Sequence, residues 1–253
     1  MLGWSESKLS RIETARTGIS AGDLERLLTA YDVAEPERLR LRELSQQSQA
    51  RTWWHPYRAG VPDPLERYVG YEAESTAMFE WEPQIVPGLL QTDEYARAVV
   101  EVARNLESPD VVEQLVALRM ARQTVLTRHP EPQLWAILDE GALRRQVGGR
   151  QVMRRQVQRL YDASQRPRIT LQILPFSAGI HLAVTGAFTI FEFGPGGQSP
   201  VIHSEGITGG TFRDRPAEVR QYREVFDDVS RRALDPHATR EFLAGLGSEL
   251  QDS

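Results

Sequence analysis

The sequence lacks several features on which common protein classes depend. Its 253 residues include no cysteine, which excludes disulfide bonds, cysteine nucleophiles and cysteine-ligated zinc or iron–sulfur sites. No apolar run approaches the roughly 18 residues that span a bilayer, and the N-terminus lacks the apolar core of a secretory signal. We therefore expect a cytoplasmic protein with no membrane partner.

Lysine and asparagine are almost absent. Lys8 and Asn105 are the single examples of each, whereas arginine occurs 29 times, which is typical of a high-G+C genome. The net charge is −5, and an acidic chain does not favour a long nucleic-acid-binding surface, because such binding needs clustered basic residues. A small DNA-reading element remains compatible with this charge.

The first fifty residues predict consecutive short helices. Ser5 is placed to cap a helix over 6–15, and Ser20 stands in capping-box spacing before a second helix, with Asp23 in place of the usual Glu. A third helix is expected from Glu35. The apolar positions expected to face a small core are Leu9, Ile12, Leu24, Leu27, Leu28, Tyr31, Leu39, Leu41 and Leu44.

The rest of the chain predicts a larger α+β domain. Helical patterns cover 65–80, 108–127 and 150–165, with shorter ones ending at 98 and beginning at 141, and two helices close the chain. Strands are expected at 134–138, 169–174, 188–193 and 201–204, which gives a sheet of about four strands. The fold class is therefore α+β, with a head at 1–50, a connector at 51–64 and a larger domain at 65–253.

Two features predict contact surfaces. The connector contains adjacent Trp53 and Trp54, which a solvated linker would not expose, so we expect them to dock on the larger domain. The first of the two final helices spaces apolar residues by three and four between Val219 and Val229. Exposed apolar area on either feature would indicate a protein-binding surface.

The helix over 6–15 is the candidate DNA-binding element. Its polar residues Glu6, Ser7, Lys8 and Arg11 point away from the apolar pair Leu9 and Ile12, as a helix in a major groove requires. Arg11 is suited to a guanine edge, and Ser5 and Arg16 are suited to phosphates. An ordinary amphipathic surface helix would show the same pattern.

A candidate ligand pocket is formed by polar residues at strand and loop ends of the larger domain. These residues are Glu140, Arg144, His181 and Glu205. A carboxylate beside His and Arg is suited to binding a small polar ligand or to proton transfer, although surface ion pairs produce the same pattern. No motif for catalysis, a metal or a cofactor occurs, so none is expected, and enzyme activity is left open but not favoured.

The segment WSESKLSRIE at 4–13, with GIS at 18–20 after it, resembles the recognition helix of the Xre/Cro-type helix-turn-helix family. This resemblance implies a homodimer that reads operator DNA, with Ser5, Glu6, Ser7, Lys8 and Arg11 facing the DNA. A complete Xre head has two helices before the recognition helix, and here Met1 falls at the end of the second. We expect that the true start lies upstream; the alternative is that DNA binding is weak or lost.

The larger domain resembles the companion domain of actinobacterial WhiJ-like regulators, whose role is not established. The resemblance rests chiefly on VPGLLQT at 86–92, LDEGALRR at 138–145 and LPFSAG at 174–179. Three hypotheses follow. The first is a dimeric transcriptional regulator whose larger domain senses a ligand or a small partner protein. The second is an antitoxin-like protein-interaction module, and the third is a ligand-binding protein or enzyme derived from a regulator that lost DNA binding.

Overall fold

The computed structural model describes residues 4, 12, 19–42, 63–103, 108–206 and 209–252. The chain divides into two compact units, Met1–Pro56 and Tyr57–Ser253. The described helices of the smaller unit are α2 (Ala21–Ala30) and a helix over 35–42. Ser20 caps α2 as expected, because its Oγ accepts a hydrogen bond from the Asp23 N–H at 3.1 Å.

The larger unit alternates helices and strands. Its α-helices are α4 (Asp63–Glu74), α5 (Asp93–Ala103), α6 (Pro109–Arg122), α7 (Glu140–Arg144), α8 (Arg150–Ala163), α9 (Pro216–Arg232) and α10 (Pro236–Asp252). Three short 3-10 turns are η2 (Gly88–Leu90), η3 (Gln123–Thr127) and η4 (Phe176–Ala178). The strands are β1 (Ala77–Glu82), β2 (Gln133–Asp139), β3 (Ile169–Leu174), β4 (Phe188–Glu192), β5 (Val201–Ser204) and β6 (Thr211–Arg213).

The strands form one sheet in the order β3-β2-β1-β4-β5-β6. β1, β2 and β3 are parallel, whereas β4, β5 and β6 add antiparallel pairs on the other side of β1. The α+β class is confirmed, but the described sheet has six strands where the sequence predicted about four. The helix predicted over 65–80 is wrong beyond Glu74, because the residues from Ala77 form central strand β1.

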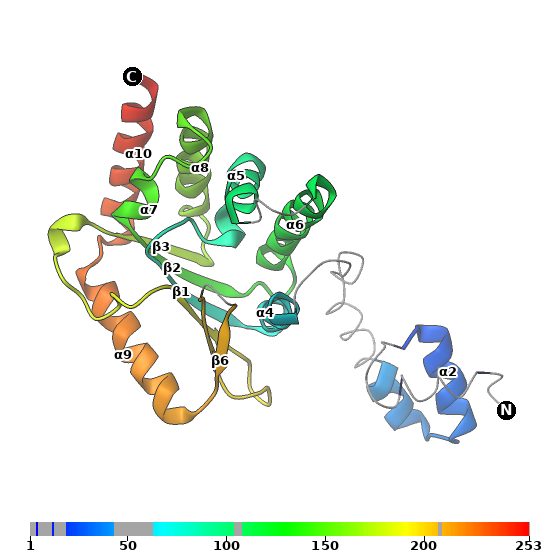
Figure 1. Cartoon of the computed structure of the whole chain (residues 1–253). Coiled ribbons are helices and arrows are strands. Elements are labelled where there is room, and N and C mark those ends of the chain that lie inside the picture. Colours follow the sequence, from blue (N-terminus) through cyan, green and yellow to red (C-terminus); the bar gives the residue numbers. More distant parts are fainter. Residues whose placement is uncertain are drawn as a thin grey trace. The chain divides into compact units, whose positions relative to one another are not determined.

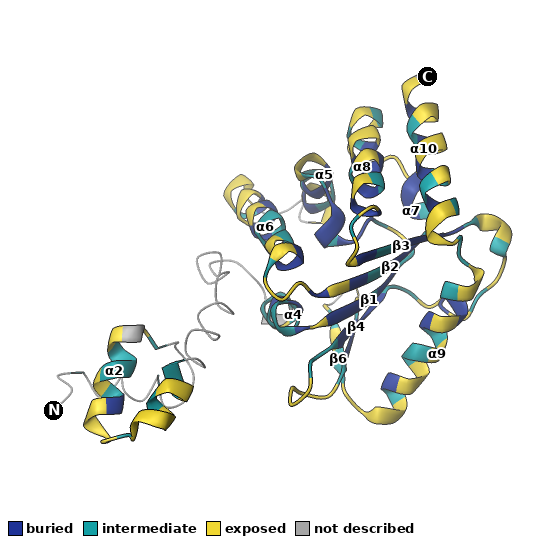
Figure 2. Ribbon diagram, turned by 180° about the vertical axis from the view of Figure 1, so that it is seen from behind, coloured by how far each residue is buried: buried dark blue, intermediate teal, exposed yellow. Residues whose placement is uncertain are grey.

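Helices cover both faces of the sheet (Figure 1). α4, α5, α6, α8 and α10 lie on one face and α9 lies on the other. The first face carries a core that includes Met78, Leu138 and Phe191, while α9 packs over a second core around Trp81, Ile190 and Phe226. Figure 2 shows that the buried residues of these helices lie on the sides that face the strands.

Two predicted contact surfaces have different outcomes. The apolar residues of α9 do not form an exposed face, because Val219, Phe226 and Val229 are buried against the sheet. This helix therefore lacks the exposed apolar area that would indicate a protein-binding surface, because the sheet covers that helix face. Trp53 and Trp54 lie outside the described residues, so their docking stays a prediction.

Glycine substitutions test the packing of the larger unit. At Gly245 in α10 an added Cβ meets no atom within 4 Å. Gly245→Ala should raise the free energy of unfolding by about 0.5–1 kcal/mol, because alanine lowers the conformational entropy of the unfolded chain.

At Gly210 an added Cβ overlaps the ring of buried His203, so Gly210→Ala should lower the free energy of unfolding by about 1–3 kcal/mol. Urea denaturation of both variants measures these changes. Unchanged stability of Gly210→Ala would show that the His203 ring is free to move.

Candidate functional site

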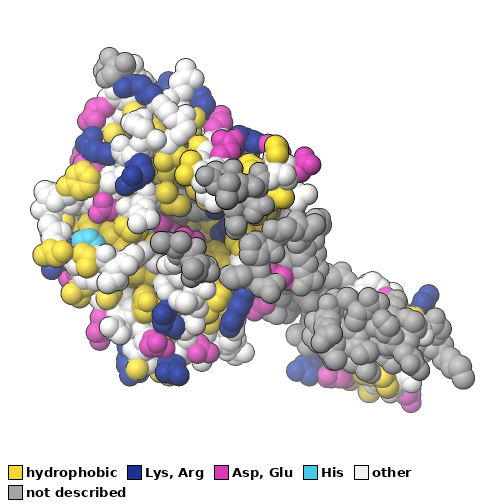
Figure 3. Space-filling model, viewed as in Figure 1, with side chains coloured by type: hydrophobic (Ala, Val, Ile, Leu, Met, Phe, Trp, Pro, Cys, Tyr) yellow, Lys and Arg dark blue, Asp and Glu magenta, His cyan; other side chains and the backbone are white. Residues whose placement is uncertain are grey.

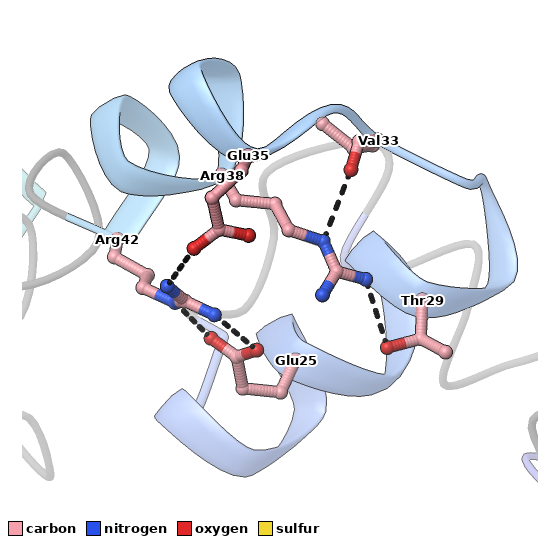
Figure 4. Close-up of polar contacts among 6 residues, drawn as sticks. All are labelled: Glu25, Thr29, Val33, Glu35, Arg38 and Arg42. Atoms are coloured by element: carbon pink, nitrogen blue, oxygen red, sulfur yellow. Dashed lines mark hydrogen bonds and ion pairs between the residues drawn. The ribbon is translucent and has the colours of Figure 1, made fainter.

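The described helices of the smaller unit are joined by two arginines (Figure 4). Arg42 donates two hydrogen bonds to the Glu25 carboxylate, at 2.6 and 3.0 Å, and a third to Glu35 at 3.2 Å. The hydrogen bond from Arg42 holds the pKa of Glu25 below its usual value. Arg38 donates to the Val33 carbonyl and to the Thr29 hydroxyl, each at 3.0 Å. These contacts fix the helix over 35–42 against α2.

The predicted DNA-contacting residues fall in the part of the chain that the structure leaves undescribed. Ser5, Glu6, Ser7, Lys8, Arg11 and Arg16 all lie outside the described residues, and so does Leu9. Ile12 is helical and half-buried. Two positions expected to be apolar core, Tyr31 and Leu39, are instead exposed. Leu28 on the same predicted stripe is buried.

Two of the four predicted pocket residues lie together. Arg144 donates to Glu140 at 2.6 Å across one turn of α7 and also contacts Glu249 of α10 at 3.2 Å. The second oxygen of Glu140 accepts the Phe176 N–H at 2.9 Å. Partial burial acts to raise the pKa of Glu140, but these two donors outweigh it and hold that pKa below its usual value. Arg144, Glu249 and Arg150 line a hollow of about 540 Å³.

The other two predicted pocket residues interact elsewhere. The His181 ring packs edge-on against Trp81, and its Nδ1 accepts the Ala183 N–H at 3.2 Å. Glu205 follows β5 and is exposed, and its charge acts on Glu80 and Glu82 of β1. The described contacts therefore do not join the four residues into one site.

A different set of ionisable residues gathers where α4 and α6 cover β1. We call this set the β1 cluster; its members are Glu72 of α4, Glu80 and Glu82 of β1, Arg119 and Arg122 of α6, and Glu205 after β5. Strand register aligns Glu80 with Thr189 of β4, and Thr189 with His203 of β5. All three of these residues are buried. A polar row therefore crosses the sheet beneath the two helices.

The deepest ion pair of the β1 cluster joins Arg122 to Glu72. The guanidinium donates to the two carboxylate oxygens at 2.7 and 3.3 Å, and it also lies over the Tyr68 ring. Burial acts to lower the pKa of Arg122, but the Glu72 carboxylate outweighs it and holds that pKa above its usual value. Arg122 therefore stays charged inside the protein.

Glu80 is buried without such a partner. It is 3% exposed, and its Oε2 accepts no hydrogen bond from any residue that the structure describes. Burial raises the pKa of Glu80 to about 8, and the nearby charge of Glu72 adds to the effect. Glu80 is consequently protonated in much of the free protein at neutral pH.

Glu82 and Arg119 extend the cluster toward the surface, and both are half-buried. Burial raises the pKa of Glu82 well above its usual value, and Glu205 and Glu80 reinforce the shift. Burial, with the charge of Arg122, lowers the pKa of Arg119 to about 10. Arg119 donates to the side-chain oxygen of buried Gln91 at 3.0 Å.

Sequence reasoning missed most of the β1 cluster. Glu205 was predicted as a pocket residue, but Glu80 was assigned to a helix and Glu82 was left unassigned. Neighbouring His203 had no predicted role. His203 packs against the Tyr68 and Phe212 rings, and burial lowers its pKa to about 4. The available signal was the alternation of acidic and apolar residues in AMFEWE at 77–82, which is typical of a strand.

The described residues contain no group of three or more His, Asp or Glu side chains arranged to hold a metal ion. Within the same residues, no helix has the length and apolar character required to cross a bilayer.

Comparison with known families identifies both parts of the chain. An N-terminal helical region followed by an α+β domain defines a class of two-part proteins, and residues 1–41 match a helix-turn-helix domain. Residues 65–245 match the family DUF5753, a domain of unknown function. Because this match covers most of the chain, the protein belongs to the DUF5753 family. Searches of curated proteins and of solved structures found no match.

The unpartnered Glu80 predicts how stability depends on pH. Between its ordinary value of 4.5 and about 8 the folded protein binds more protons than the unfolded chain, so rising pH lowers stability across this window. Glu80→Gln cannot ionise and removes this loss. Its free energy of unfolding should exceed that of the wild type by an amount that grows with pH to a few kcal/mol. Urea denaturation at several pH values measures the difference.

Glu113→Gln on α6 is the matched control, because Glu113 is exposed and paired with Arg97. Its pH profile should lack the growing gain in stability. Parallel profiles for Glu80→Gln and the wild type would contradict the raised pKa of Glu80.

Proposed function

We propose that this protein is a DNA-binding transcriptional regulator of the Xre type. The observation that carries the proposal is the helix-turn-helix match over 1–41 on the same chain as a DUF5753 domain. In this proposal a head at 1–50 binds operator DNA, a connector spans 51–64, and the domain at 65–253 senses a ligand or a small partner protein. The protein acts in the cytoplasm of an actinobacterial cell, as a homodimer.

The contacts around Arg42 support a head with a defined shape. A helix can read a major groove only when neighbouring helices hold it at a fixed angle to the DNA backbone. The ion pair of Arg42 with Glu25 and the hydrogen bond from Arg38 to Thr29 join α2 to the helix over 35–42, as such a head requires. The residues proposed to contact DNA are Ser5, Glu6, Ser7, Lys8, Arg11 and Arg16.

DNA binding is tested with a labelled fragment of the promoter region of the protein's own gene. Arg11→Ala should weaken binding by about 1–3 kcal/mol if Arg11 reads a guanine edge. Arg40→Ala is the matched control, because Arg40 is exposed on the helix over 35–42 and pairs with Glu37. Fluorescence anisotropy measures the affinity of each protein for the promoter fragment and for a fragment of random sequence, and the ratio of the two affinities gives the specificity. Equal affinity of the wild type for the two fragments would contradict sequence-specific regulation.

A second candidate function, an antitoxin-like protein-interaction module, is favoured by the segment between β3 and β4. Four apolar side chains of this segment are at least 59% exposed: Phe176, Ile180, Leu182 and Val184. Figure 3 shows hydrophobic side chains gathered on the left of the larger unit, where Figure 1 places this segment. An exposed apolar patch of this kind is typical of a protein contact surface.

Hydrogen bonds hold the backbone of this segment in place. The Trp81 indole N–H donates to the Ala183 carbonyl at 3.0 Å, and Asp228 of α9 accepts the Leu182 N–H at 3.2 Å. Arg232 donates to the Ile180 carbonyl at 3.3 Å. The apolar side chains are therefore presented on an ordered backbone, which lowers the entropic cost of binding. We propose that they bind a protein partner, which is a second copy of the chain in the dimeric regulator and a small partner protein in the antitoxin-like module.

Analytical ultracentrifugation tests this interface. Leu182→Asp should shift the protein from dimer toward monomer, because it places a charge in a desolvated contact. Val102→Asp is the matched control, since Val102 of α5 is 81% exposed outside the segment. A Leu182→Asp protein that stays dimeric would remove the segment from the interface. A wild-type protein that is monomeric would favour the antitoxin-like module over the dimeric regulator.

A further inference from the structure

Three glutamates of the β1 cluster form a graded series from the protein interior to its surface. Glu80 is buried, Glu82 at the end of β1 is half-buried, and Glu205 after β5 is exposed. No described residue forms a hydrogen bond or an ion pair with the carboxylate of any of them. Glu80 and Glu82 lie on one face of β1, and the register of Trp81 with Phe188 and of Phe188 with Ser204 brings Glu205 to the same end of the sheet as Glu82.

The topology gathers this series at one edge of the sheet. β1, β2 and β3 run parallel, so their carboxyl ends share one edge of the sheet, and the pairing of Ser204 with Phe188 brings the end of β5 to that edge. Glu82 at the end of β1 and Glu205 after β5 therefore lie at the same edge, and Glu80 lies one step deeper on the same face of β1.

The charge balance of the β1 cluster indicates the sign of a ligand. Arg122 is paired with Glu72, which leaves Arg119 as the cluster arginine whose charge acts on Glu82 and Glu205. The three glutamates therefore exceed their available cation by two charges when all are ionised. Burying an uncompensated carboxylate is costly, and a bound cation would offset that cost.

The arrangement of the described carboxylates favours an organic cation over a metal ion. The described His, Asp and Glu residues nowhere converge closely enough to hold a metal ion. An organic cation spans a wider site, because an ammonium or guanidinium group donates several hydrogen bonds along different directions. The Oε2 atom of Glu80, enclosed and unpartnered, is an acceptor suited to the deepest of these bonds.

We propose that Glu80, Glu82 and Glu205 form a binding site for an organic cation that carries a guanidinium or ammonium group. Glu80 accepts the charged group at the base of the site, Glu82 contacts it from the wall, and Glu205 attracts it at the entrance. The same chemistry is offered by a free small molecule and by an arginine or lysine side chain of a partner protein. That this site is the sensory site of the regulator rests on the proposed function. Binding of the cation itself does not require DNA.

Binding at this site is coupled to proton release. The ionisable groups coupled to Glu80 are Glu72 and Tyr68 of α4, Arg122 of α6, Glu82 of β1 and Glu205 after β5. Arg119 of α6 acts on Glu82, and His203 of β5 lies in register with Glu80 two strands away. His203, with a pKa of about 4, stays neutral above that pH, and both arginines stay charged, so Glu80 and Glu82 are the groups that lose protons to a cation. Affinity should therefore rise with pH, by up to roughly tenfold per pH unit for each proton released, and the contribution of Glu80 should level off above about pH 8.

Isothermal titration calorimetry of the full chain without DNA tests the proposal. The probes are agmatine, which carries a guanidinium and an ammonium group, and a blocked Gly-Arg-Gly peptide; 1,4-butanediol is the uncharged control. We expect saturable binding of at least one cationic probe, no binding of the diol, and at least tenfold weaker binding by Glu80→Gln, equivalent to about 1.4 kcal/mol. Glu113→Gln, on the exposed side of α6, should bind as the wild type does.

The outcomes distinguish a free small molecule from a partner's side chain, and they test the cation site independently of the DNA-binding proposal. Tighter binding of agmatine supports a free small molecule, and tighter binding of the peptide supports a partner's side chain. Absence of saturable binding of both probes at millimolar concentration overturns the site, as does equal binding by Glu80→Gln and the wild type. Circular dichroism confirms that Glu80→Gln is folded. Because DNA is absent, failure here leaves the DNA-binding proposal standing, and failure of promoter binding leaves this site standing.

Discussion

The arrangement of the larger unit depends on the buried ion pair between Arg122 and Glu72. This ion pair joins the end of α6 to α4 over the central strand. The two helices cover the polar row formed by Glu80, Thr189 and His203 on β1, β4 and β5. Removal of either partner would leave an uncompensated charge in the interior, which typically costs about 3–5 kcal/mol. Because Arg122 neutralises Glu72, only Arg119 remains to offset the negative charges of Glu80, Glu82 and Glu205.

The central strand explains both the success and the failure of sequence reasoning about the fold. β2, β3, β4 and β5 were predicted from short apolar runs bounded by turn residues, and all four are confirmed. β1 was missed because Glu80 and Glu82 lie on a face of the strand that points into the protein. A strand in a core normally has apolar residues at such positions. The burial of Glu80 and Glu82 is understandable only with α6 in place, about forty residues further along the chain.

The smaller unit shows the same division between local and distant interactions. The Ser20 cap of α2 could be predicted, because its acceptor and donor are three residues apart. The pairing of Arg42 with Glu25 spans seventeen residues and leaves no periodic signal. The candidate pocket divides similarly: Glu140 and Arg144 meet across one helical turn, whereas His181 and Glu205 are placed by strands whose order the sequence did not reveal.

β1 also brings the two proposed contact surfaces close together. Consecutive residues of a strand point to opposite faces, so Glu80 and Glu82 enter the cluster beneath α4 and α6 while Trp81 enters the core beneath α9. The Trp81 indole holds the Ala183 carbonyl and thereby the exposed segment between β3 and β4. The proposed cation site and the anchor of the exposed segment therefore lie on neighbouring residues of one strand. A single peptide bond separates the buried site from the anchor of the exposed surface, which is the shortest connection a strand can provide between its two faces.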